Sequence, residues 1–462
     1  MKIKRFMIAA PKSGSGKTMI TCALLQLIKN RGENITSYKC GPDYIDPMFH
    51  KEILDVHSKN LDTFFTDEET TVQLFLDGKS DGDFAVLEGV MGLYDGLGGI
   101  SQEGSSYHLA KITHTPIILV VDTKGMGKSV IPLISGFLQY DTNHLIKGVL
   151  LNRMSKGYYD IIKPLIEQEL PIKVVGYFPE QKDIVFESRH LGLVMPEEVN
   201  NIKNKLNEIS GRLKNTINLD LLIDIATNAD DICYEVIEDK QNDCPRNIVN
   251  LAVAMDEAFC FYYEDNLRLL EKYGAKLQYF SPLHDAKLPD DCDALLLGGG
   301  YPELYAKDLS ENISMLNSIK TAFENGLPTI AECGGFMYLH TYLYGSCDET
   351  ALAFGLVGAL NNKCYYKGKL VRFGYVELKE KQSNFLPKGE TIKAHEFHYY
   401  DSTDNGQNCI ATKPTTGKMY ECVISNGNYW LGFPHLYYPS NPHFVENFIK
   451  KAQKYKNKKL DI

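Results

Sequence analysis

Short, continuous apolar runs that alternate with helical stretches constrain the fold of this chain most strongly. Runs rich in Val, Ile and Leu occur at residues 84–90, 116–122 and 147–152. Runs of this kind are typical of strands buried on both faces of a parallel sheet. Helical patterns lie before and between them, for example at residues 19–32, where a glycine ends the pattern. The sequence therefore predicts an open, doubly wound α/β fold.

The β/α rhythm stops once and then restarts, which predicts two domains. With 462 residues the chain is too long for one ordinary hydrophobic core. Residues 197–227 are helical and polar on one face, and residues 228–247 are acidic, interrupted by proline and poor in apolar runs. The strand pattern returns at residue 248. We therefore expect domains at residues 1–230 and 247–462, joined by a linker at 231–246.

Composition and charge exclude several classes of protein. Hydrophobic residues make up 44% of the chain and charged residues 23%, as in soluble globular proteins. The net charge of −10 argues against a nucleic-acid or anionic-membrane surface. The eleven cysteines lack metal-ligand spacing, and there is neither a secretory segment nor an apolar run of 18 residues. We expect a cytoplasmic protein with reduced thiols, small-molecule substrates, and no nucleic-acid or membrane partner.

A glycine-rich stretch, APKSGSGKT at residues 10–18, follows the first apolar run and precedes a helical pattern. Such a turn presents backbone N–H groups to phosphate at a helix N-terminus. Pro11 stands where the strict P-loop pattern has its first glycine, whereas Gly-Lys-Thr is intact. Lys12 is interpreted as a surface lysine. The alternative is a lysine that reaches across a homodimer, and a homodimer is one expected state of the protein. The residues expected to bind ATP are Ser13, Gly14, Ser15, Gly16, Lys17 and Thr18.

Two further stretches, at residues 39–50 and 87–96, carry charged residues next to glycines and prolines. Glu88 ends an apolar strand, where ligands of such sheets bind, so it is placed to hold Mg²⁺ beside the nucleotide. Turn chemistry is the alternative, because Asp and Gly are common in turns. The expected Mg²⁺ ligands are Thr18, Glu88 and Asp43, and the expected substrate-binding residues are Lys39, Asp43, Asp46 and Asp95.

The stretch PTIAECGGFMYL, at residues 328–339, predicts a strand, a tight turn and a helix with Cys333 at the turn. This is the geometry of a nucleophile elbow, in which the helix N-terminus favours a thiolate. A thiol needs a base, and the candidates are His395, His398 and His435. Backbone N–H groups near the turn can stabilise an oxyanion. We expect Gly299, Gly300 and Gly334 to approach the substrate and to stabilise the oxyanion.

Eight motifs in order resemble the cobyrinic acid a,c-diamide synthases, glutamine-dependent amidating enzymes of corrinoid biosynthesis. They are SGSGKT, KCGPDYIDPMFH, LEGVMGLYDG, RHLGLV (189–194), DEAFCFYYEDNLRLLE, LGGGYPEL, AECGGFMYL and HEFHYY. The resemblance implies an N-terminal P-loop NTPase domain similar to dethiobiotin synthetase, with a mainly parallel sheet. It implies a C-terminal glutamine amidotransferase α/β domain of the triad type.

The resemblance also implies that His435 is the partner of Cys333, because the family's histidine lies in a late segment that reads HLYY here. His395 and His398 are then structural or face the substrate. Two departures from the family pattern occur: Lys393-Ala394 replaces the family's Arg-Gly, and Phe433-Pro434 replaces its aromatic or Ser/Thr residues before the late histidine. Since no acidic residue follows His435 at a family-like spacing, we expect a catalytic dyad.

The activity implied by the resemblance is amidation of the a and c acetate carboxylates of cobyrinate, using ATP, Mg²⁺ and glutamine. Three alternatives stay open. The same chemistry could act on hydrogenobyrinate or on a nickel sirohydrochlorin. The four-amide reaction of cobyric acid synthase is disfavoured by residues 41–50. A protein of another class, an ATP-driven switch with an inactive glutaminase domain, is disfavoured by the intact Cys333 and His435.

Overall fold

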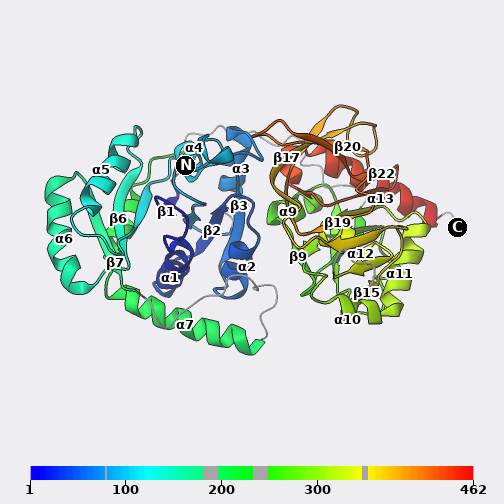
Figure 1. The fold of residues 1–462 in the computed structure, drawn as a ribbon, viewed down its shortest axis with the longest axis horizontal. Helices are drawn as coiled ribbons and strands as arrows, with labels where there is room; N and C mark the ends of the chain where they lie inside the picture. The colour runs from blue at the N-terminus through cyan, green and yellow to red at the C-terminus, as the bar shows by residue number, and fades with distance from the viewer. Residues whose placement is uncertain (1, 79–80, 181–195, 233–247, 346–351, 461–462) are drawn as a thin grey trace. The chain divides into compact units, whose positions relative to one another are not determined.

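The computed structural model describes residues 2–78, 81–180, 196–232, 248–345 and 352–460 (Figure 1). The chain divides into two compact units, Met1–Ile237 and Glu238–Ile462. The motif at residues 189–194 lies outside the described residues, as do residues 233–246 of the expected linker. The domain boundaries given above therefore stay a prediction.

The first unit is built on one seven-stranded sheet in which every neighbouring pair is parallel, with strand order β3-β2-β4-β1-β5-β6-β7. This confirms the predicted parallel sheet of the N-terminal half. The strands are β1 (Lys4–Ala9), β2 (Ile35–Cys40), β3 (His57–Leu61), β4 (Phe84–Glu88), β5 (Ile117–Asp122), β6 (Ile146–Asn152) and β7 (Lys173–Phe178).

Both faces of this sheet are buried, as its continuous apolar runs predict. Alternate side chains of β5 belong to two different hydrophobic clusters, Ile117 and Leu119 to one and Ile118 and Val120 to the other. The other strands and the helices supply most of the remaining residues of each cluster. The helices are α1 (Lys17–Asn30), α2 (Ile45–Glu52), α3 (Glu68–Asp77), α4 (Ser106–Ile112), α5 (Val130–Tyr140), α6 (Lys156–Glu169), α7 (Pro196–Lys214) and α8 (Leu219–Thr227).

Two strands of this sheet, β2 and β3, lack the continuous apolar sequence of the other strands. Their sequences are ITSYKC and HSKNL, yet Ser37, Ser58 and Lys59 on them are buried. Hydroxyl groups satisfy one another there, since Ser37 Oγ and Ser58 Oγ lie 2.7 Å apart. Of the two, β2 is the neighbour of β4, the strand that ends in Glu88. It places Lys39 in the interior of the unit.

The second unit has a six-stranded sheet of order β10-β8-β11-β13-β23-β22, parallel except for the pair β22 and β23. Its strands are β8 (Val249–Ala254), β10 (Ala275–Phe280), β11 (Ala294–Leu297), β13 (Thr329–Glu332), β22 (Ile424–Ser425) and β23 (Tyr429–Gly432). Its helices are α9 (Glu264–Lys272), α10 (Ala306–Glu311), α11 (Ile313–Glu324), α12 (Gly334–Tyr338) and α13 (His443–Leu460).

Three smaller sheets complete the second unit. The largest is antiparallel, with order β21-β20-β17-β18-β24, and β24 (His435–Leu436) is its edge. The strands of these sheets are β9 (Phe259–Phe261), β12 (Gly299–Gly300), β14 (Tyr342–Tyr344), β15 (Ala353–Gly355), β16 (Lys363–Tyr366), β17 (Arg372–Glu380), β18 (Thr391–His398), β19 (Tyr400–Ser402), β20 (Cys409–Thr412) and β21 (Met419–Cys422). In the described part of the chain, no helix combines the length and the apolar character needed to cross a membrane.

Candidate functional site

The glycine-rich loop joins β1 to α1, and a side chain from β6 holds it. Gly14 and Gly16 have positive φ angles of 73° and 86°, a conformation that favours glycine. A Cβ atom on Gly16 would lie 2.5 Å from Asn152 Nδ2. Asn152 in turn donates a hydrogen bond of 2.8 Å to the carbonyl of Ser15. The loop is thus fixed, while Ser13 and Gly14 are exposed.

Lys17 and Thr18 begin α1 and point toward the end of β4. The Lys17 ammonium donates to the carbonyl of Met91, and burial followed by the charge of Lys39 lowers the pKa of Lys17. Thr18 Oγ1 donates a hydrogen bond of 2.7 Å to Glu88 Oε1. The structure therefore brings the start of α1 and the end of β4, which carry predicted nucleotide and metal ligands, next to each other.

Lys39, Asp46 and Glu88 form a buried charge cluster beside Thr18. Lys39 Nζ lies 2.8 Å from Glu88 Oε1 and also pairs with Asp46, and all three residues are at most 6% exposed. Burial opposes ionisation of Asp46, but the charge of Lys39 outweighs it and lowers the pKa of Asp46. Burial, followed by the charge of Asp46, raises the pKa of Glu88 to about 7. Lys39 is thus a counter-ion in the interior in this structure.

Asp43 and Asp95, two other predicted site residues, make contacts typical of turns. Asp43 Oδ1 accepts a hydrogen bond of 2.8 Å from the N–H of Ile45, at the start of α2. Asp95 Oδ2 accepts one of 3.0 Å from the N–H of Gly92. Asp46 rather than Asp43 contacts Thr18, with 3.5 Å between Thr18 Oγ1 and Asp46 Oδ2.

The cluster at Thr18 offers donors that suit Mg²⁺. Within the described residues, no three His, Cys, Asp or Glu side chains already form a metal-binding group. However, Glu88 Oε2 is buried without a hydrogen-bond partner, next to a threonine hydroxyl and a second carboxylate. Hard oxygen donors of this kind, one or two of them carboxylates, are what Mg²⁺ takes from proteins. The residues present therefore fit the expected ion.

His50 is a site residue to which the sequence analysis gave no role. It is fully buried on α2, and its Nε2 lies 3.7 Å from Glu88 Oε2 while Ser37 Oγ lies 2.8 Å from its Nδ1. Burial lowers the pKa of His50 to about 4, so its ring is neutral near pH 7. It packs behind the Glu88 carboxylate. Its position at the end of the 39–50 motif was the only sequence signal for it.

Cys333 stands at a strained elbow between β13 and α12, as its flanking glycines predicted. Its φ and ψ angles are 46° and −103°, which a residue with a side chain rarely adopts. Its N–H donates a hydrogen bond of 2.8 Å to the carbonyl of Gly432 at the end of β23. The neighbouring strand thus fixes the elbow, and that same strand leads directly to His435.

The glycines predicted for the oxyanion lie between Cys333 and His435. A Cβ atom on Gly299 would lie 2.3 Å from His435 Cε1, and one on Gly300 would lie 2.1 Å from the carbonyl oxygen of Ala258. A Cβ atom on Gly334 would lie 3.1 Å from the backbone nitrogen of Gly300. Segments far apart in the sequence therefore meet here because glycine permits close backbone approach.

Cys333 and His435 are buried and electrically neutral in this structure. Burial, followed by the charges of His395 and His398, lowers the pKa of His435 to about 3. Burial, followed by the charge of Glu303, raises the pKa of Cys333. Burial thus outweighs the expected preference of the helix N-terminus for a thiolate, since α12 has only five residues.

The two other candidate histidines lie next to the segment that carries His435. His395 lies opposite His435 in the β18–β24 pairing. His398 donates from Nδ1 to the carbonyl of Tyr400, and its ring stacks on Phe433 with centroids 4.1 Å apart. Stacking on Phe433, two residues before His435, supports the segment that carries the proposed base.

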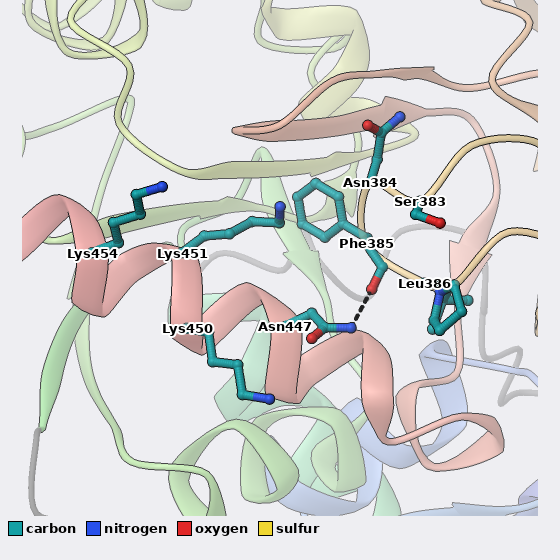
Figure 2. Close-up of a pocket in the computed structure, with 9 residues that line it drawn as sticks. Ser383, Asn384, Phe385, Leu386, Asn447, Lys450, Lys451 and Lys454 are labelled. Atoms are coloured by element: carbon teal, nitrogen blue, oxygen red, sulfur yellow. Dashed lines mark hydrogen bonds between the residues drawn. The ribbon is translucent and has the colours of Figure 1, made fainter.

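A separate cavity of about 420 Å³ lies on the second unit between α13 and residues 383–387 (Figure 2). Figure 2 shows Lys450, Lys451 and Lys454 along α13, with Asn447 donating a hydrogen bond of 2.8 Å to the carbonyl of Phe385. None of its lining residues is one of the predicted site residues. We assign no function to this cavity.

Two family models match the chain, one for each half. Residues 6–193 match a CobQ/CobB/MinD/ParA nucleotide binding domain. Residues 250–441 match a CobB/CobQ-like glutamine amidotransferase domain. The glycine-rich loop and the cluster at Glu88 fall in the first match, and Cys333 and His435 fall in the second.

Full-length relatives agree with both models. A cobyrinate a,c-diamide synthase from Caldanaerobacter subterraneus subsp. tengcongensis is 39% identical, covering 98% of this chain and 99% of the relative. Proteins of the same name from Clostridium acetobutylicum and Priestia megaterium are 37% and 35% identical, and the alignments cover 97% and 100% of this chain and 100% of each relative. The chain belongs to the cobyrinate a,c-diamide synthase family.

Membership of the cobyrinate a,c-diamide synthase family confirms the resemblance found in the sequence and the predicted fold class. The nucleotide-binding half has the parallel sheet, and the glutamine amidotransferase half follows it. The substrates of such an enzyme are small molecules. The roles of individual side chains remain proposals.

Proposed function

We propose that this chain amidates the a and c acetate carboxylates of cobyrinate to give cobyrinate a,c-diamide, consuming ATP and glutamine. One observation carries the proposal. A single chain of this family holds a phosphate loop beside buried carboxylates, and a cysteine elbow beside a buried histidine. A carboxylate resists ammonia because its charge repels a nucleophile and oxide is a poor leaving group. The first site would make the carboxylate reactive toward a nucleophile, and the second would release the ammonia that attacks it.

The N-terminal site would activate the carboxylate. Backbone N–H groups of residues 13–18 would hold the phosphates of ATP, and Lys17 would leave the carbonyl of Met91 to reach them. Thr18 and Glu88 with Asp43 or Asp46 would hold Mg²⁺, which neutralises phosphate charge. Transfer of the γ-phosphoryl group to the substrate carboxylate makes an acyl phosphate. The carbonyl carbon then has phosphate as its leaving group.

The C-terminal site would release ammonia from glutamine. Cys333 Sγ would attack the side-chain amide carbon as His435 accepts the thiol proton. N–H groups among Gly299, Gly300 and Gly334 would stabilise the oxyanion. His435 then protonates the departing ammonia, and water hydrolyses the thioester to glutamate. The released ammonia displaces phosphate from the acyl phosphate.

The proposal assigns activation to residues 1–230 and glutamine hydrolysis to residues 247–462, joined through 231–246. It needs no nucleic-acid or membrane partner, places the enzyme in the cytoplasm, and accepts a monomer or a homodimer. A hydrogenobyrinate or nickel sirohydrochlorin substrate would leave every step unchanged. Incubation with each macrocycle, ATP and glutamine, followed by the mass of the product, identifies the substrate.

The division of labour is tested with Cys333→Ala. We expect glutaminase activity and glutamine-driven diamide synthesis to fall at least about a thousandfold, because the nucleophile is gone. Synthesis driven by ammonium chloride and ATP should continue, since it needs only the other site. Cys260→Ala is the matched control, because Cys260 is a half-buried thiol in the same unit. Glutaminase activity that survives in Cys333→Ala would contradict the proposal.

A further inference from the structure

A carboxylate close to Cys333 has no part in the mechanism described above. Glu303 follows the Gly298–Pro302 segment, whose Gly299 contacts His435. Pro302 Cδ lies 2.9 Å from the position of a Cβ atom on Gly334, the residue after Cys333. Glu303 therefore extends from a backbone segment that is fixed against both proposed catalytic residues.

The backbone around Glu303 is held in place by hydrogen bonds. The N–H of Tyr301 donates 2.9 Å to the carbonyl of Ala258, and that of Leu304 donates 3.1 Å to the carbonyl of Tyr301. Helix α10 begins at Ala306, directly after this turn. The position of Glu303 is thus set by a tight turn rather than by its own side chain.

Glu303 has no counter-ion within the described part of the chain. Among the residues that the structure describes, no side chain forms an ion pair or hydrogen bond with its carboxylate. Burial raises the pKa of Glu303 to about 7. Glu303 is half-buried, and charges that are partly removed from water in proteins are usually paired, so a carboxylate without a partner beside a reactive site suggests that its partner arrives with the substrate.

The charge of Glu303 also opposes the chemistry proposed for Cys333. After burial, it is the largest influence that raises the pKa of the Cys333 thiol. A thiolate is the reactive form of cysteine, so an unpaired carboxylate here keeps the nucleophile inactive. A cation that binds Glu303 would remove this opposition. The α-ammonium group of glutamine is such a cation, and its nitrogen is four bonds from the amide carbon that Cys333 attacks.

We propose that Glu303 binds the α-ammonium group of glutamine, which selects the amino acid over simple amides and allows the thiol to ionise once substrate is present. The proposal rests on the nucleophilic role proposed for Cys333. Glu303 acts as a binding residue for the substrate, and through its charge it adjusts the nucleophile. No bond is made or broken by Glu303 itself.

The test compares glutamine with glutaramate, the same amide without the α-amino group. In Glu303→Gln the KM for glutamine should rise about tenfold to a hundredfold, as for loss of a charged hydrogen bond. Hydrolysis of glutaramate should not weaken, so the preference for glutamine should nearly vanish. Glu303→Asp should restore part of that preference. Glu257→Gln is the control, since Glu257 is exposed in the adjacent loop and pairs with His284 at 3.0 Å.

A second readout follows the thiol itself. The rate at which iodoacetamide alkylates the Cys333 peptide, measured by mass spectrometry without substrate, should increase in Glu303→Gln because the opposing charge is absent. A Glu303→Gln variant that keeps the KM and the preference of the wild type would overturn the proposal. If Glu303→Gln does not fold, Glu303→Ala takes its place, and an unchanged preference for glutamine together with an unchanged alkylation rate in that variant overturns the proposal. The Cys333→Ala test fails independently of this one. It asks whether Cys333 is the nucleophile, whereas the Glu303 variants ask how glutamine is selected.

Discussion

The two sites of this chain treat buried charge in opposite ways. In the first unit, Lys39 lies between Asp46 and Glu88, so opposite charges are paired in the interior. In the second unit, burial lowers the pKa of His435 and raises those of Cys333 and Glu332, which leaves each group neutral. The first site holds paired ions before substrate arrives, whereas the proposed nucleophile and base of the second site are neutral at that stage.

The difference matches the two reactions proposed for the chain. Phosphoryl transfer needs fixed charges around a highly charged substrate, and charges fixed in advance cost no reorganisation when the reaction occurs. Glutamine hydrolysis needs a thiolate for one step only. A thiol kept neutral by burial is protected from side reactions until substrate displaces water and supplies charge. The three predictions below test whether this contrast is real.

The largest expected effect is on the paired charges of the first unit. Lys39→Met removes the cation between Asp46 and Glu88 and leaves two buried carboxylates uncompensated. Breaking a buried pair in this way costs about 3–5 kcal/mol. We expect chemical denaturation of the variant to show a loss of that size in the first unit, with part of it recovered when Mg²⁺ is added.

Lys4→Met is the matched control for the buried pair. Lys4 Nζ lies 2.8 Å from Glu33 in a partly exposed ion pair, with the lysine side chain 39% exposed. Such surface pairs contribute about 0–1 kcal/mol. Equal losses in the two variants would mean that the first unit does not depend on its buried charges, and the contrast between the sites would fail.

A smaller effect is expected on glutamine hydrolysis when the close approach of Gly299 to His435 is disturbed. In Gly299→Ala the added Cβ would lie 2.3 Å from His435 Cε1, so the imidazole must move. Displacement of a catalytic group by about 1 Å can cost about a hundredfold in rate. We therefore expect kcat for glutamine hydrolysis to fall by that factor, while ammonium-driven synthesis continues.

Gly427→Ala serves as the control for Gly299→Ala. A Cβ at Gly427 would meet no atom within 4 Å, and the residue lies in the same unit. The variant should hydrolyse glutamine as the wild type does. If Gly299→Ala also keeps full glutaminase activity, His435 does not occupy the position that the proposed mechanism requires.

Sequence patterns predicted those parts of the molecule that depend on local chemistry. Continuous apolar runs identified β4, β5 and β6, and flanking glycines identified the loop at Lys17 and the elbow at Cys333. These features follow from burial on both faces of a sheet and from the backbone freedom of glycine. The family resemblance, confirmed by the relatives, added the order of the two domains.

Features that depend on distant partners could not be predicted in this way. Strands β2 and β3 are polar in sequence and are buried because Ser37 and Ser58 satisfy each other. The contact of Thr18 with Asp46 depends on how α2 begins, which spacing alone does not fix. The burial that leaves Cys333 neutral comes from residues spread over the whole second unit.

The smallest predicted effect concerns Glu332, the buried neighbour of Cys333, and its dependence on pH. Glu332 Oε1 accepts a hydrogen bond of 3.0 Å from Tyr438, and burial raises its pKa to about 8. Its protonated form is favoured in the folded state, so its stabilising contribution is complete below about pH 4.5 and is lost as pH rises through about 8. The group contributes a slope of up to about 1.4 kcal/mol per pH unit.

Glu332→Gln should flatten this part of the stability curve, because glutamine accepts the same hydrogen bond and does not ionise. The difference between variant and wild type, measured by denaturation of the second unit between pH 6.5 and 8, isolates Glu332. His435 adds no slope there, because its lowered pKa gives stability that is present above about pH 6.5 and is lost only as pH falls toward about 3. Parallel curves for wild type and Glu332→Gln would show that Glu332 is ionised in the fold, and the second site would then hold charge as the first one does.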